Sequence, residues 1–133
     1  MCPMLDRIDV QMEVLPVEYR QLSSTHTEES SSDVRARVTA ARQVQVERLG
    51  SVASCNAYIP DSLLREICGM ESAAEKLLHS AFDRLHMSAR GYSRILKVAR
   101  TIADLERSGQ IAASHIAQAI QMRSLDRKYW GSK

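Results

Sequence analysis

The spacing of hydrophobic and polar residues changes once along the chain and separates an N-terminal part from a helical part. In the N-terminal part, residues 7–14 (RIDVQMEV) alternate between apolar and polar side chains. Alternation with a period of two is typical of a half-buried β-strand. The sequence offers this strand no obvious partner. Residues 1–22 are therefore predicted to hold one orphan strand, either cut from a sheet or packed against another molecule.

The second spacing begins after residues 23–32 (SSTHTEESSS), a polar stretch that is predicted to be a flexible linker. Beyond it, apolar residues recur every three or four positions, as in helices with one buried face. A mainly α fold is predicted, a compact bundle of about five helices over residues 33–130 with short connections. The expected helices cover 33–49, 61–68, 71–86, 88–109 and 113–123.

Residues at the helix ends support these ranges. Ser32 or Asp33 can cap the first helix, which Gly50 would stop, and Ser88 can cap the fourth. The third helix has the clearest periodicity. Its predicted buried face consists of Ala73, Ala74, Leu77, Leu78, Ala81, Phe82 and Leu85.

Composition supports helices and limits the classes of function. Apolar residues make up 44% of the 133 residues but aromatic ones only 5%, as in a single helical domain. The net charge of +2, from 18 basic and 16 acidic residues, is too balanced for coating nucleic acid, so an anion site must be local. The chain has neither a membrane-length apolar run nor a signal-peptide pattern, so a soluble cytoplasmic protein without a membrane partner is expected.

The candidate chemistry lies on the fourth predicted helix. Arg90, Arg94 and Lys97 share one side, and Thr101 and Asp104 fall within the same arc of roughly 80°. A solvated face is the ordinary interpretation of such a pattern. The position of Arg90 in the first turn favours an anion site, because the positive end of the helix dipole adds to its charge.

Arg7 stands immediately before the predicted strand. It can pair with its neighbours Asp6 and Asp9, or it can be held out for a phosphate.

Other sites are not supported by the sequence. The chain contains no phosphate-cradling GxxxxGK[ST] loop. Its three cysteines form no CxxC pair, and its four histidines lack metal-ligand spacing, so no metal site is expected. No nucleophile and base can be paired from spacing alone.

Three segments nevertheless resemble one family. PMLDRIDVQMEV, SARGYSRILKVARTIADLE and IAASHIAQAIQMRSLDR are similar, in this order, to segments of the magnesium-chelatase-like AAA+ ATPases, in particular of the ComM (YifB) branch. The last segment carries the family's R-x-LDR ending at Arg123, Leu125, Asp126 and Arg127. The resemblance covers nearly the whole chain.

The resemblance implies that the chain is the C-terminal helical lid of such an ATPase, preceded by a remnant of its core. It implies that Arg7 is an arginine finger for a neighbouring subunit's ATP and that Arg90 is the sensor-2 arginine, with Arg94 as the competing assignment. ATP and Mg²⁺ are expected in the full-length protein and neither on this chain, which lacks the Walker A and Walker B motifs and should be inactive alone. The implied partners are the AAA+ core, the other subunits of a homo-oligomeric, hexameric ring, and DNA.

Two alternatives remain open from the sequence. One is the lid of a magnesium chelatase ATPase subunit, which would serve metal insertion into a porphyrin. The other is a stand-alone helical adaptor that binds protein or DNA through a surface of Arg90, Arg94, Lys97 and Arg100.

Overall fold

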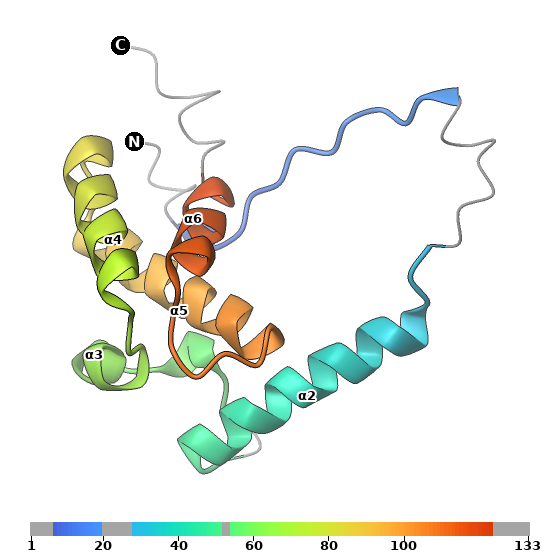
Figure 1. Cartoon of the computed structure of the whole chain (residues 1–133), viewed down its shortest axis with the longest axis horizontal. Coiled ribbons are helices and arrows are strands. Elements are labelled where there is room, and N and C mark those ends of the chain that lie inside the picture. The colour runs from blue at the N-terminus through green and yellow to red at the C-terminus, as the bar shows by residue number, and fades with distance from the viewer. Residues whose placement is uncertain (1–6, 20–27, 52–53, 124–133) are drawn as a thin grey trace.

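The computed structural model describes residues 7–19, 28–51 and 54–123, and within these ranges the chain is mainly helical (Figure 1). This confirms the predicted fold class. The described α-helices are α2 (Ser31–Leu49), α3 (Leu64–Ile67), α4 (Ser72–Leu85), α5 (Ala89–Leu105) and α6 (Ala113–Gln121). Two 3₁₀ turns, η2 (Asn56–Tyr58) and η3 (Asp61–Leu63), connect α2 to α3. None of the helices in these ranges is both long and apolar enough to cross a membrane.

Small residues on α5 and α6 let the helices of the core approach closely. Ala99 and Ala103 of α5 and Ala119 of α6 are fully buried. Around them pack the larger side chains of the same core, which are Ile59, Leu64, Leu78, Ile95, Leu96, Ile102, Ile111 and Ile116. Each fully buried leucine or isoleucine contributes about 1.5–3 kcal/mol of hydrophobic stabilisation. The helix α5 is therefore central, with α6 and α3 packed against it and α4 against α6.

The predicted buried face of the third helix is too wide. Ala74 and Leu78 of α4 are buried, but Ala73 is exposed and Phe82 is 37% exposed. Phe82 lies at the surface and contacts Tyr92 of α5 edge to face, with ring centroids 6.0 Å apart. Only α6 covers α4 extensively, so the buried face of α4 is a narrower stripe of residues than predicted.

The helix α2 begins earlier than predicted and makes few apolar contacts. Ser30 is its N-cap, in place of Ser32 or Asp33, because the Ser30 hydroxyl accepts a hydrogen bond from the Asp33 N–H (3.2 Å). The last two residues of the expected linker thus belong to the helix. Gly50 ends the helix as predicted, in the left-handed conformation with φ of 72°. Only Ala41 and Gln45 of α2 are buried.

The predicted strand at residues 7–14 is not formed among the described residues. Residues 10–18 have no regular secondary structure, and the side chains expected to be half-buried are exposed, from 43% at Ile8 to 88% at Val14. The physical reason is the lack of a pairing edge, since the one isolated bridge in the described ranges joins Met70 to Ile111. The first half of the predicted linker (23–27) and the LDR tripeptide lie outside the described residues.

Candidate functional site

The first turn of α5 presents Arg90 to solvent. Ser88 caps the helix as predicted, because its hydroxyl oxygen accepts a hydrogen bond from the Gly91 N–H (3.0 Å). Arg90 is exposed, and no other residue in the described ranges gives it a hydrogen bond or an ion pair. A guanidinium without a partner, beside the positive end of a helix of 17 residues, can receive an anion with no prior bond to break.

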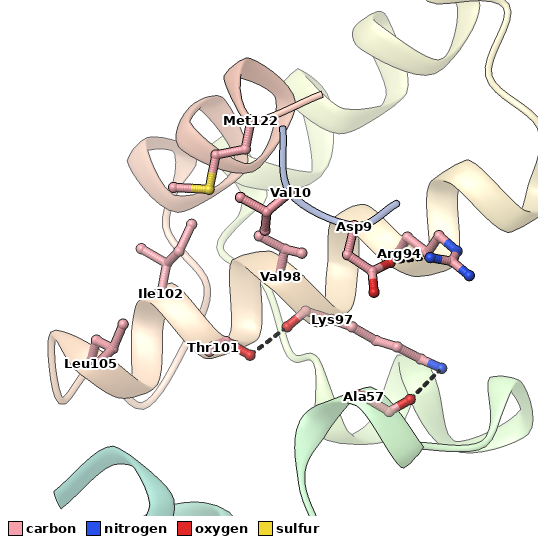
Figure 2. A pocket seen from close by; sticks show the side chains of 10 residues that line it. All are labelled: Asp9, Val10, Ala57, Arg94, Lys97, Val98, Thr101, Ile102, Leu105 and Met122. Carbon is pink, nitrogen blue, oxygen red and sulfur yellow. Dashed lines mark hydrogen bonds and ion pairs between the residues drawn. The ribbon is translucent and has the colours of Figure 1, made fainter. Parts of the chain in front are cut away.

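Arg94, one turn further along α5, is already engaged. Its side chain is 26% exposed. Its Nη1 donates to the Asp9 carboxylate (Figure 2). The same nitrogen donates to the main-chain oxygen of Arg7 (2.7 Å). The two arginines that compete for the sensor-2 assignment therefore differ in availability.

The segment of residues 7–11, which we call the N-terminal strap, lies along the ends of α5 and α6. Besides the contacts with Arg94, the Gln11 N–H donates to the Met122 carbonyl oxygen (2.6 Å) and Arg123 Nη1 donates to the Ile8 carbonyl oxygen (3.2 Å). The strap thereby carries Arg7 to the α5 helix. The Arg7 side chain is exposed and has no partner among the residues that the structure describes.

A groove of about 450 Å³ runs along α5 beside the strap. Its walls are mostly apolar, and Arg94 and Lys97 stand together at one end (Figure 2). Lys97 reaches across to the 3₁₀ turns, where its Nζ donates to the Ala57 carbonyl oxygen (3.3 Å) and lies 3.9 Å from the Asp61 carboxylate. The apolar residues that line the groove are Val10, Ala57, Val98, Ile102, Leu105 and Met122.

The rest of the predicted polar arc is not a solvated face, because Asp104 is buried and Thr101 is half-buried. Asp104 is 2% exposed and accepts hydrogen bonds from Arg48 (2.6 and 3.0 Å), Arg100 (3.1 Å) and Asn56 (2.8 Å). Asn56 also donates to the hydroxyl oxygen of Thr101 (3.0 Å). Helix α2 and the turn η2 cover this part of α5. A carboxylate with this many donors can be buried without an unsatisfied lone pair.

Arg100 is likewise buried, at 1% exposure, so it cannot belong to the adaptor surface that the sequence suggested. Besides Asp104, it donates to the carbonyl oxygens of Ser108 (2.5 Å) and Gly109 (3.0 Å), which follow the end of α5. The hydrogen bond with Asp104 also raises the pKa of Arg48, although burial opposes it. Through their bonds to Asp104 and to the carbonyl oxygens of Ser108 and Gly109, the two arginines hold α2, α5 and the following loop together.

The described residues contain no cluster of three or more His, Cys, Asp or Glu side chains that could hold a metal ion. Two of the histidines that the structure describes are held at structural or surface positions. His115 Nδ1 accepts a hydrogen bond from the Ala112 N–H (2.9 Å), so its Nε2 carries the proton that faces Glu106 (2.8 Å). His79 lies on the surface beside Asp83.

Comparison with known proteins identifies relatives of this chain. Residues 28–123 match the family described as "Magnesium chelatase, subunit ChlI C-terminal". The competence protein ComM of Haemophilus influenzae is 37% identical over 126 residues, and the uncharacterized protein YifB of Escherichia coli is 36% identical over the same length. The uncharacterized protein Mb2921c of Mycobacterium bovis is 34% identical over 122 residues.

The matches cover 94% of this chain for the first two relatives and 91% for the third, but only 24% of each relative. The chain thus spans about a quarter of the length of these curated proteins.

Proposed function

Because the chain belongs to the magnesium chelatase ChlI C-terminal family, we propose that it acts as the nucleotide-responsive helical lid of a ComM-like AAA+ ATPase. One observation carries the proposal: Arg90 is an exposed guanidinium without a described partner, in the first turn of a capped helix. Arg94, Lys97 and Arg100 of the same helix are each bound to other residues. Arg90 is thus the residue of α5 that can bind a phosphate with least reorganisation.

The chemistry suits an arginine in this position. Phosphoryl transfer spreads negative charge over the γ-phosphate oxygens, and a positioned guanidinium stabilises that charge through paired hydrogen bonds. We propose that Arg90 reaches the γ-phosphate of ATP in its own subunit, as a sensor-2 arginine. Binding would draw the lid towards the nucleotide, and hydrolysis would release it.

Arg7 is proposed as the arginine finger. Its side chain is exposed, and it precedes an extended segment that leaves the helical bundle (Figure 1). A residue so placed is free to reach the ATP of a neighbouring subunit. Its effect would be on the transition state more than on binding of the nucleotide.

Mg²⁺ does not fit the residues that the structure describes. The described residues offer guanidinium groups for phosphate oxygens but no cluster of carboxylates for the metal. We therefore expect Mg²⁺ and the phosphate-cradling loop to belong to another part of an intact ATPase. This chain would contribute arginines and be inactive alone.

Exposed apolar residues on the extended segment support an AAA+ core and neighbouring ring subunits as partners. These side chains are 60–88% exposed, and the part of the chain that the structure describes offers their backbone no β-sheet partner, a combination that favours pairing with a sheet edge. We propose that the core covers them in a homo-oligomeric, hexameric ring. They are Met12, Val14, Leu15, Val17 and Tyr19.

The substrate of the ring is proposed from its relatives. The Haemophilus influenzae relative is named a competence protein, and we propose that the ring acts on DNA, in recombination or transformation, in the cytoplasm. Stimulation of ATP turnover by DNA would support this. Stimulation by a porphyrin and the other chelatase subunits would favour the alternative, a magnesium chelatase subunit.

The decisive experiment uses an intact ATPase that carries these residues. Arg90→Ala is expected to weaken coupling to ATP and lower turnover, while circular dichroism shows the helices unchanged. Arg7→Ala is expected to lower turnover by a factor on the order of 10³ or more, with nucleotide binding largely intact.

Mixing subunits provides the control. An Arg7→Ala subunit mixed with one disabled in the Walker A loop should recover part of the activity, because some interfaces then pair an intact finger with an intact pocket. An inactive mixture of two variants that both assemble normally would refute the assignment of Arg7.

A further inference from the structure

The bonds of Arg94 point to a role different from that of Arg90. Resting on the function proposed above, we propose that Arg94 and Asp9 form a clamp that fixes the N-terminal strap to α5, so that Arg7 and Arg90 move as one unit. Arg94 is then a positioning residue. It transmits the position of the lid, which Arg90 senses in its own subunit, to the arginine that acts on the neighbouring subunit.

The first support is the geometry of the clamp. One Arg94 nitrogen bonds both the Asp9 carboxylate and the main-chain oxygen of Arg7 itself (2.7 Å). The bond to a main-chain atom fixes the backbone from which the Arg7 side chain projects and leaves that side chain free. A residue whose purpose was to bind phosphate would have to break both bonds first.

The second support is that the strap is held at several points. Ile8 accepts a hydrogen bond from Arg123, the Gln11 N–H donates to Met122, and Val10 lines the groove beside Val98 (Figure 2). Together with the bonds of Arg94, these contacts join the strap to α5 and to the residues that follow α6. A rotation of the lid would therefore move the strap with it.

The third support is the spacing along α5. Arg90 and Arg94 are four residues apart, so they lie one turn apart on the same side of a continuous helix. A force on Arg90 acts on Arg94 through rigid helical backbone, without a loop between them. The path from the proposed ATP contact at Arg90 to the strap contact at Arg94 is thus short and contiguous.

The clamp is tested first on the chain itself, without nucleotide, by hydrogen exchange at the Gln11 amide. Asp9→Asn and Arg94→Gln should each accelerate this exchange by about five- to tenfold, because the strap leaves Met122 more often. Arg37→Gln is the matched control. It breaks another ion pair at the surface, with Glu29 (2.8 Å), and should leave Gln11 unchanged. Equal exchange at Gln11 in all three variants would overturn the clamp.

Coupling is tested in the intact ATPase through the kinetic constants for ATP. Asp9→Asn and Arg94→Gln should lower kcat about tenfold with little change in KM, whereas Arg90→Gln should raise KM as well. The charge-swapped double variant Asp9→Arg/Arg94→Asp should recover part of the lost kcat, which direct phosphate binding by Arg94 would not predict.

Two failures can be told apart. If Arg94→Gln raises KM as Arg90→Gln does and the swap recovers nothing, Arg94 binds ATP and the coupling role is wrong, while the proposed function stands. If Arg7→Ala and Arg90→Ala leave turnover unchanged, the proposed function fails, and the coupling role that rests on it fails too. Accelerated Gln11 exchange in Arg94→Gln would still establish the clamp as a structural contact.

Discussion

At the scale of single residues, Asp104 connects three separate elements of the structure. It bonds Arg48 of α2, Asn56 of η2 and Arg100 of its own helix. Removing a carboxylate from two arginines leaves buried positive charge without compensation. Its loss should therefore destabilise the fold far more than the loss of an exposed acid.

We predict that Asp104→Ala lowers the free energy of unfolding by about 3–5 kcal/mol, the usual cost of removing one partner of a buried ion pair. Urea denaturation followed by circular dichroism measures it. Asp83→Ala is the control. Because the Asp83 side chain is 64% exposed, its removal should lower the free energy of unfolding by less than about 1 kcal/mol. Similar losses for the two variants would mean that the buried network contributes little.

The buried thiol of Cys68 should make the stability of the fold depend on pH in the alkaline range. Burial raises the pKa of its thiol from 9.0 to about 11. Between these values the unfolded chain loses the proton while the folded chain keeps it, so the stabilisation present below pH 9 declines as the pH rises towards 11. The total loss should be about 2–3 kcal/mol.

The measurement compares denaturation midpoints at several pH values from 8 to 11. Cys68→Ala should flatten the decline relative to the native chain, whereas Cys55→Ala should leave its slope unchanged. The same slope in all three proteins would show that other groups cause the decline.

Among the helices, α2 depends most on its ends, because only Ala41 and Gln45 of its 19 residues are buried. Gly50 stops it at φ of 72°, where a side chain is strained although a Cβ atom would meet nothing within 4 Å. We predict that Gly50→Ala costs about 1 kcal/mol of stability through backbone strain alone.

Gly109→Ala is the matched control for this prediction. A Cβ atom there also meets nothing within 4 Å, and the φ of Gly109 is not positive, so the free energy of unfolding should change little. Equal effects at the two glycines would show that strain at the helix end is negligible.

The sequence predicted the positions of the helices better than the contacts between them. The periodicity of α5 and α6 and the cap at Ser88 are local signals, and the structure confirms them. The burial of Asp104 was missed because its partner Arg48 lies 56 residues away. The pairing of Arg100 with Asp104 at four-residue spacing was a local signal that could have been noticed. The strand failed because alternation alone does not supply a partner for its backbone.

The candidate site also has one part that the sequence predicted and one part that it could not. The position of Arg90 in the first turn followed from helix length and cap, and the structure confirms it. The bonds between Arg94 and residues 7 and 9 could not be predicted, because they join segments 85 and 87 residues apart. They decide which arginine is available, and only tertiary structure shows them.

For the entire chain, the absence of a phosphate-cradling loop from the sequence predicts weak binding of nucleotide. Isothermal titration of the isolated chain with MgATP should show no binding in the micromolar range and no phosphate release. One exposed arginine gives too few contacts to overcome the entropy of association. Micromolar binding that is lost in Arg90→Ala would mean that the lid holds ATP unaided.

The way α2 is attached also has a kinetic consequence. The helices α4, α5 and α6 follow one another through short connections, so their contacts require only small loops to close, whereas Arg48 must find Asp104 across 56 residues. Docking of α2 should thus come after the folding transition state. In stopped-flow experiments, Arg48→Ala should accelerate unfolding and leave the refolding rate nearly unchanged, while Ile116→Val, inside the early core, should slow refolding.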